Sequence, residues 1–191
     1  MIPHYKNIHN RFKINGIHLD KEAVFVFSYS LIKEGDAFEK ELGNFLLDWF
    51  DDKETIELTT SGTTGTPKNI TINKQSMVHS AIATADFFDL HPQDKALLCL
   101  PPRYIAGKMM ILRALIIGLE LDILTPSSNL DDLQLDKKYD FVAIVPLQAE
   151  NSLAKLYQFK KIIVGGAKVS DELAIKLKLV QSDIYETYGM T

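Results

Sequence analysis

Short apolar runs alternate with segments of helical length from residue 95 onward, and this alternation constrains the fold more than any other feature of the chain. The runs are rich in Leu, Ile, Val and Phe, as buried strands are. We expect strands at 95–100, 121–124, 141–145, 161–164 and 184–186. Helices are expected at 108–118, at 148–157 and from the cap Ser170 to about residue 180. Strands joined by helices predict an α/β fold with a mostly parallel sheet and helices on both faces.

The first 94 residues contain similar elements but one different connection. The run 23–27 is β-branched and aromatic, which predicts a strand. From 36 to 50, apolar residues recur every three or four positions and predict an amphipathic helix, and a further helix is expected at 74–88. Strands at 56–60 and 69–73 are separated by one loop without a helix. They therefore predict a hairpin rather than a parallel pair.

The composition is that of an ordinary globular chain. Its 191 residues are 46% apolar and 24% charged, which predicts a single domain with a sizeable core over residues 1–191. The 21 basic and 25 acidic side chains give a formal net charge of −4. This balance provides no electrostatic footprint for nucleic acid or for an anionic membrane, so we expect neither as a partner.

Cysteine and histidine usage bears on compartment and metal binding. The single cysteine, Cys99, cannot form an internal disulfide, which favours a reducing, cytoplasmic setting. It lies within an apolar run, so we interpret it as a buried small hydrophobe rather than a nucleophile. The N-terminus has no apolar signal-peptide core, and the five histidines show no metal-ligand spacing. No metal ligand is therefore predicted among the side chains.

The loop between the two hairpin strands carries the most chemical information. It reads Thr60-Ser61-Gly62-Thr63-Thr64-Gly65-Thr66-Pro67-Lys68. Its glycines allow a sharp turn and a close approach of the backbone to a ligand. Successive N–H groups can then converge on phosphate oxygens, hydroxyl groups add donors, and Lys68 adds a mobile positive charge. The pattern predicts an anion-binding loop rather than a simple polar turn.

This loop differs from the phosphate loop of Walker-type NTPases. That loop ends in adjacent Gly, Lys and Ser or Thr and opens a helix. Here Pro67 precedes Lys68, and a strand is expected to follow. A phosphoryl-transfer NTPase using Lys68 with Thr63 or Thr64 is the less favoured hypothesis.

The nonapeptide resembles the phosphate loop of the adenylate-forming superfamily, which includes acyl-CoA synthetases, luciferases and peptide-synthetase adenylation domains. Three later segments resemble further motifs of that superfamily in the same order. They are Leu100-Pro101-Pro102-Arg103-Tyr104-Ile105-Ala106-Gly107, Val164-Gly165-Gly166-Ala167-Lys168 and Glu186-Thr187-Tyr188-Gly189-Met190-Thr191. The resemblance covers roughly residues 55–191 and implies part of the large N-terminal domain of that fold.

The resemblance implies a two-step reaction that uses ATP, Mg²⁺ and coenzyme A. A small-molecule carboxylic acid attacks the α-phosphorus of ATP, and the thiol of CoA then displaces AMP. The implied catalytic residues are Lys68, which stabilises the departing pyrophosphate, and Thr191, which contacts the α-phosphate. The implied nucleotide-binding residues are Thr60, Ser61, Gly62, Thr63, Thr64, Gly65, Lys68, Gly165, Gly166, Ala167, Glu186, Tyr188, Gly189 and Thr191. Among these, Tyr188 is expected to stack on the adenine ring.

Within the superfamily, the chain looks most like the compact 2-succinylbenzoate–CoA ligases of menaquinone biosynthesis. The resemblance implies an acid-binding region formed by Arg103, Tyr104, Gly107 and Gly166. Many relatives carry an aromatic residue and His where this chain has Arg103 and Tyr104. An Arg there would suit a dicarboxylate by bidentate pairing, and the alternative interpretation is a surface Arg after a proline turn.

The motif match stops before the end of the superfamily pattern. A metal-binding Glu would follow Thr191, and a ribose-binding Asp and a small lid domain with a catalytic Lys would come later. We therefore expect these residues to form most of an N-terminal domain whose C-terminal lid is absent, with weak nucleotide binding and little turnover alone. A non-catalytic nucleotide-binding module, or a ligase for another aromatic or fatty acid, remains the alternative, and the sequence leaves the oligomeric state open.

Overall fold

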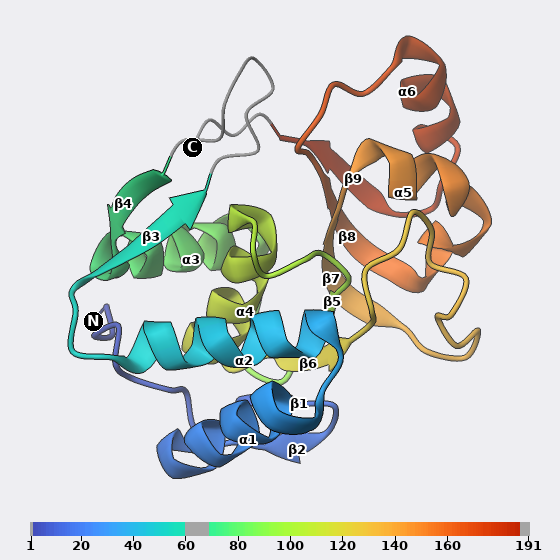
Figure 1. Cartoon of the computed structure of the whole chain (residues 1–191). Helices are drawn as coiled ribbons and strands as arrows, with labels where there is room; N and C mark the ends of the chain where they lie inside the picture. Colours follow the sequence, from blue (N-terminus) through green and yellow to red (C-terminus); the bar gives the residue numbers. More distant parts are fainter. Residues whose placement is uncertain (1, 60–68, 188–191) are drawn as a thin grey trace.

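The computed structural model describes residues 2–59 and 69–187, and within them seven strands form one sheet (Figure 1). The spatial order is β2-β1-β6-β5-β7-β8-β9. Every neighbouring pair is parallel except β1 and β2. The strands are β1 (Lys13–Ile14), β2 (Ile17–His18), β5 (Lys95–Leu98), β6 (Glu120–Ile123), β7 (Tyr139–Ile144), β8 (Phe159–Val164) and β9 (Asp183–Glu186). The prediction of a mostly parallel sheet is confirmed.

Helices cover both faces of this sheet, as predicted (Figure 1). One face packs against α1 (Lys21–Glu34), α2 (Ala37–Phe50), α3 (Lys74–Phe88) and α4 (Ile105–Ile117). The other packs against α5 (Pro146–Asn151), the 3₁₀ helix Leu153–Gln158 and α6 (Asp171–Leu177). Alternate strand residues face the two cores because successive side chains point to opposite faces. Within β5, for example, Leu97 belongs to one core and Leu98 to the other.

Local sequence signals account for where several helices begin and end. Asp36 and Glu39 form a reciprocal capping box at the start of α2. Ser170 accepts a hydrogen bond from the Leu173 N–H at the start of α6, as predicted. The left-handed residues Asp89 and Gly118 end α3 and α4. The predicted helix 74–88 is confirmed at both ends.

The predicted hairpin forms a separate two-stranded sheet of β3 (Thr55–Thr59) and β4 (Asn69–Asn73). The strands are antiparallel, with Thr59 opposite Asn69 at the open end of the hairpin. Ile56 and Leu58 are buried, so the core holds the β3 strand in place. The interpretation of Cys99 as a core residue is also confirmed, and burial raises the pKa of its thiol to about 12.

The predicted strand at 23–27 is wrong, because these residues lie within helix α1. Asp20 caps this helix by accepting a hydrogen bond from the Ala23 N–H. The buried positions Val24 and Ser28 are four residues apart, which is helical spacing. Because one of the two is a serine, the helical period is hidden in the apolar pattern of the sequence.

Two further differences concern helix continuity and a missed strand pair. The predicted helix 148–157 is divided into α5 and the 3₁₀ helix at Ser152. The Ser152 hydroxyl accepts a hydrogen bond from the Leu130 N–H at 2.8 Å. The short strands β1 and β2 were not predicted, since two-residue strands carry almost no periodic signal.

Candidate functional site

The predicted phosphate loop joins β3 to β4, but its residues lie outside the described part of the chain. They are Thr60, Ser61, Gly62, Thr63, Thr64, Gly65 and Lys68. The two strands that flank them pair over all five residues, from Thr55 with Asn73 to Thr59 with Asn69. This pairing places Thr59 and Asn69, the residues on either side of the nine-residue connection, opposite each other. The hairpin itself is held by the buried residues Ile56 and Leu58.

A second predicted segment lies at the carboxyl ends of three neighbouring strands. Ile144 of β7, Val164 of β8 and Glu186 of β9 are aligned in register. The Gly165 N–H donates to the Ile144 carbonyl at 3.1 Å, and the Thr187 N–H donates to the Val164 carbonyl at 2.9 Å. In open α/β sheets, ligands bind beyond this edge. The predicted residues Gly165 and Glu186 therefore lie at the edge where a ligand site is expected.

Gly165 permits a close contact between two of the predicted motifs. A Cβ atom at this position would lie 2.6 Å from the Thr187 hydroxyl oxygen and 3.1 Å from the Thr187 carbonyl oxygen, so a larger residue would require Thr187 to shift. The next residue, Gly166, has a left-handed φ of +83°, and it is exposed together with Ala167 and Glu186. The structure thus brings the 165–167 loop against the segment 186–187. Tyr188, Gly189 and Thr191 lie outside the described residues.

The segment 100–107 turns directly into helix α4. The Tyr104 N–H donates to the Pro101 carbonyl at 3.1 Å, and Tyr104 is the residue before the first turn of the helix. A Cβ atom on Gly107 would lie 2.3 Å from the Pro101 carbonyl oxygen. Gly107 is therefore required for packing of the helix on the preceding turn.

Arg103, predicted to bind an acid, already contacts a carboxylate of this chain. Its Nη1 atom lies 3.2 Å from Oε1 of Glu41 on α2, and its guanidinium lies 4.9 Å from the centre of the Tyr104 ring. The side chain is 59% exposed. Because an exposed ion pair contributes little stability, Arg103 can exchange Glu41 for another carboxylate at small cost.

Sequence reasoning missed Lys108, which follows Gly107 on α4 and is buried. Its Nζ atom lies 4.6 Å from the centre of the Phe45 ring. Burial lowers the pKa of Lys108, while the charges of Asp48 and Glu41 act in the opposite direction. The sequence could have indicated this burial, because Lys108 lies within the apolar run that forms α4.

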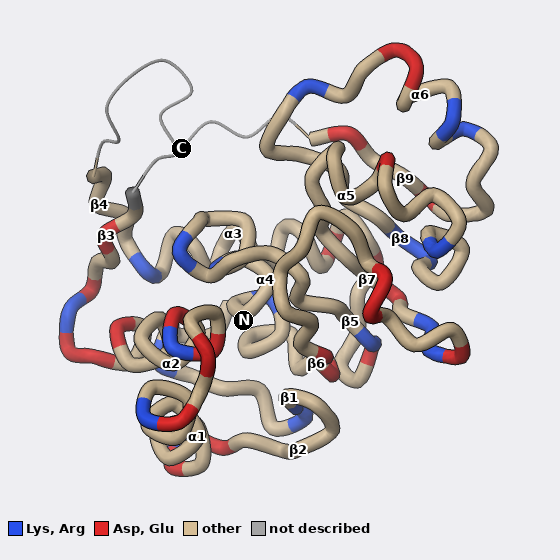
Figure 2. Tube along the Cα trace, turned by 45° about the vertical axis from the view of Figure 1, so that its right-hand side comes forward, with Lys and Arg blue, Asp and Glu red and all other residues tan. Residues whose placement is uncertain are grey.

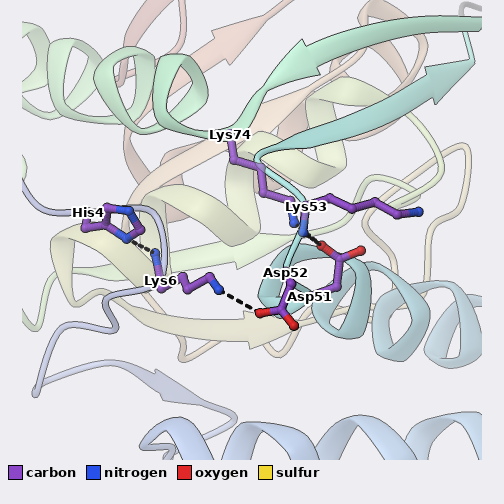
Figure 3. Close-up of polar contacts among 6 residues, drawn as sticks. All are labelled: His4, Lys6, Asp51, Asp52, Lys53 and Lys74. Atoms are coloured by element: carbon purple, nitrogen blue, oxygen red, sulfur yellow. Dashed lines mark hydrogen bonds and ion pairs between the residues drawn. The ribbon is translucent and has the colours of Figure 1, made fainter.

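A polar cluster joins the base of the hairpin to the N-terminal segment (Figure 3). Lys74 is fully buried, and its Nζ atom lies 2.6 Å from Oδ1 of Asp51. The neighbouring pair Lys6 and Asp52 has a separation of 3.0 Å, and the Asp52 side chain is fully exposed. A cavity of about 370 Å³ lies beside Tyr5 and the start of α3. None of the described residues predicted for the site lines this cavity.

The described residues provide no metal cage and no membrane span. No group of three or more His, Cys, Asp or Glu side chains among residues 2–59 and 69–187 could hold a metal ion. Among the helices of these same residues, none has both the length and the apolarity needed to cross a bilayer.

Comparison with known proteins gives a family match over most of the chain. Residues 55–191 match the family model described as AMP-binding enzyme. The 2-succinylbenzoate–CoA ligases of Oceanobacillus iheyensis and a Geobacillus species are each 28% identical, over 75% and 74% of this chain. The chain spans only 31% and 30% of the lengths of these two relatives.

A solved structure agrees with this match. The chain resembles an acyl-CoA synthetase (AMP-forming)/AMP-acid ligase II-like protein from Dyadobacter fermentans, with 31% identity and a TM-score of 0.74. The similarity covers 86% of this chain and 49% of that one. Since residues 55–191 make up less than 86% of the chain, the similarity also includes part of the N-terminal region.

Proposed function

The chain belongs to the AMP-binding enzyme family, and on this basis we propose that it forms the nucleotide-binding part of an ATP-dependent acid–CoA ligase. The observation that carries the proposal is the contact of the Gly165 loop with Thr187 at the carboxyl edge of the sheet. It supports a single site because two motifs about 20 residues apart in the sequence meet where α/β proteins bind ligands.

In the first step, a carboxylate oxygen of the acid attacks the α-phosphorus of ATP. The bond between that phosphorus and the bridging oxygen breaks, and pyrophosphate leaves with its electron pair. Lys68 and the N–H groups of the 60–68 loop would offset the charge that develops on pyrophosphate. Mg²⁺ bound to the phosphates would add to this neutralisation, and Thr191 would contact the α-phosphate.

In the second step, the sulfur of CoA attacks the carbonyl carbon of the acyl-adenylate. The carbon–oxygen bond to AMP breaks, AMP leaves, and the proton of the thiol is released. Through both steps Tyr188 would stack on the adenine ring, with Gly165, Gly166 and Ala167 as the opposite wall. Catalysis of this kind is mainly positioning and charge stabilisation, for which a fixed strand edge is suited.

For the acid, we propose 2-succinylbenzoate. The names of the two bacterial relatives support this choice, and Arg103 supplies a suitable group. Its guanidinium would leave Glu41 and pair with the second carboxylate of the substrate, with Tyr104 beside it. Gly107 would let the helix approach, and Gly166 would leave room for the acyl group.

Two measurements test the proposal. ATP-pyrophosphate exchange in the enzyme that contains this chain should proceed with 2-succinylbenzoate and fail with fatty acids. Lys68→Ala should lower the exchange rate by about 100-fold, as loss of a group that stabilises transition-state charge does. Lys53→Ala, which changes an exposed lysine outside the site, is the matched control and should retain the rate.

The possible results separate the competing functions. Exchange with a different acid would overturn only the substrate assignment. Nucleotide binding without exchange for any acid would favour the non-catalytic module over the ligase. If Lys68→Ala lowered the thermal stability of the protein strongly together with its activity, the loop would be structural.

A further inference from the structure

Helix α1 is the outermost helix on its side of the molecule and packs on α2 (Figure 1). The packed face contains Val24 and Ser28, both buried. Gly43 of α2 allows close contact there, because a Cβ atom on it would lie 2.6 Å from the Ser28 carbonyl oxygen. The opposite face of α1 has no covering element among the described residues.

That outer face carries large apolar side chains in its centre. Val26 is 71% exposed and Tyr29 is 63% exposed. Outward positions of a surface helix are normally polar, but here two neighbouring positions at the centre of the helix are apolar. The same surplus of apolar residues made the segment 23–27 look like a strand in the sequence. The helix therefore has more apolar surface than its packing on α2 uses.

Charged residues flank the apolar pair in a symmetrical arrangement. Glu22, Val26, Tyr29 and Lys33 are all exposed and follow one another at helical spacings of four, three and four residues. They form one stripe, which we call the α1 stripe. Glu22 and Lys33 lie equally far from the helix midpoint, and so do the two apolar residues. Within the described residues, neither Glu22 nor Lys33 forms an ion pair.

We propose that the α1 stripe binds the same stripe of a second copy of this chain, with the two helices antiparallel. A two-fold axis through the helix midpoint would then place Glu22 of each copy opposite Lys33 of the other, and Val26 opposite Tyr29. A parallel arrangement would place like charges together and is disfavoured. The stripe is thus complementary to itself in both charge and apolarity.

We expect the contact to be weak. A single helix face buries much less than the ~1,600 Å² typical of stable protein complexes, so we expect a dissociation constant of about 100 µM. The contact is independent of the proposed ligase function, because α1 lies at the opposite side of the molecule from the carboxyl ends of β8 and β9 (Figures 1 and 2). Dimer formation would leave that edge open.

Analytical ultracentrifugation of the whole chain, from about 10 µM to about 1 mM, tests the proposal. We expect the average mass to rise toward that of a dimer. Tyr29→Ser should weaken association about tenfold by removing the apolar centre. Ile175→Ser is the matched control, because Ile175 is 64% exposed on the remote helix α6, and it should leave association unchanged.

Charge reversal gives a sharper test of the antiparallel arrangement. Lys33→Glu and Glu22→Lys should each weaken self-association about tenfold, since each places like charges opposite one another. An equimolar mixture of these two variants should associate again, because every acidic position then faces a basic one. A mass that stays monomeric at the highest concentration would overturn the proposal, and so would a mixture that associates no better than either variant alone.

Discussion

The buried lysine at the base of the hairpin illustrates how unevenly two adjacent carboxylates can contribute to stability. Asp51 accepts hydrogen bonds from the Lys74 ammonium and the Lys53 N–H. Partial burial acts to raise the pKa of Asp51, but these two bonds hold it below its usual value. Asp52, next in the chain, pairs with Lys6, and the Asp52 side chain is fully exposed (Figure 3). Asp51 therefore neutralises a buried cation, whereas Asp52 does not.

We predict that Asp51→Ala costs about 3–5 kcal/mol of unfolding free energy, because it leaves the Lys74 charge buried and unpaired. Asp52→Ala, the matched control, should cost about 0.5 kcal/mol or less, as for other exposed pairs. Lys74→Met should cost about 1 kcal/mol, since it removes the buried charge together with its need for a partner. Urea unfolding of the three variants measures these differences, and equal costs for the two aspartates would contradict the argument.

Single residues show what sequence reasoning could and could not provide about the site. The motif containing Gly165 was recognised from its sequence, but its contact with Thr187 depends on the register of β8 and β9. Burial of Lys74 and Lys108 was not predicted, because it depends on tertiary partners in α2 and at its C-cap. The partner of Arg103, Glu41, is 62 residues away in the sequence and could not be inferred.

At the scale of elements, the prediction succeeded where one periodic signal was dominant. Helix α2 carries a capping box and a regular apolar stripe, and its prediction was confirmed. Helix α1 carries apolar residues on both faces, so its local pattern matched a strand as well as a helix. Propensity was overridden there by the packing of α1 on α2, which no local window of sequence contains.

The crossing of these two helices leads to a prediction about Gly43. Alanine normally stabilises a helix interior by about 1 kcal/mol relative to glycine. At this crossing, however, the added methyl group would meet the Ser28 carbonyl oxygen at 2.6 Å and the Ile32 side chain at 2.9 Å. We therefore expect Gly43→Ala to destabilise the protein by about 2 kcal/mol, as overpacking does.

Thermal or urea unfolding of Gly43→Ala measures this effect. Asn44→Ala is the matched control, because Asn44 is the next residue of α2 and is exposed. That substitution gains helix propensity without a clash, so it should be neutral or slightly stabilising. A stabilised Gly43→Ala variant would mean that the two helices can separate without cost.

At the scale of the whole molecule, the N-terminal segment connects elements that are far apart in the sequence. The Tyr5 N–H donates to the Gln75 side chain on α3, and the Tyr5 carbonyl accepts from the Trp49 indole on α2. Further along, β1 pairs in parallel with β6, one strand in from the edge of the sheet. Because these contacts join α2, α3 and the sheet, loosening the segment should lower the stability of the entire domain.

His9 makes this connection sensitive to pH. Its ring lies where Gly118 has no side chain, since a Cβ atom there would be 2.2 Å from the ring Nδ1 atom. That Nδ1 accepts a hydrogen bond from the Arg11 N–H at 3.1 Å, so this nitrogen carries no proton. Burial, and secondarily the charge of Arg11, lowers the pKa of His9 below 6.5.

We therefore predict that stability decreases as the pH falls below 6.5, because the unfolded chain then binds a proton at His9 that the folded chain resists. The loss should grow until the pH reaches the folded-state pKa and should be absent above neutral pH. Urea unfolding between about pH 7.5 and about pH 5.5 isolates this effect, since the carboxylates with lowered pKa, Asp51, Asp140 and Glu172, lose their contribution only at lower pH. His9→Gln should flatten the dependence in this range, whereas His79→Gln, on the exposed face of α3, should retain the wild-type slope. The same slope in all three proteins would assign the pH dependence to groups other than His9.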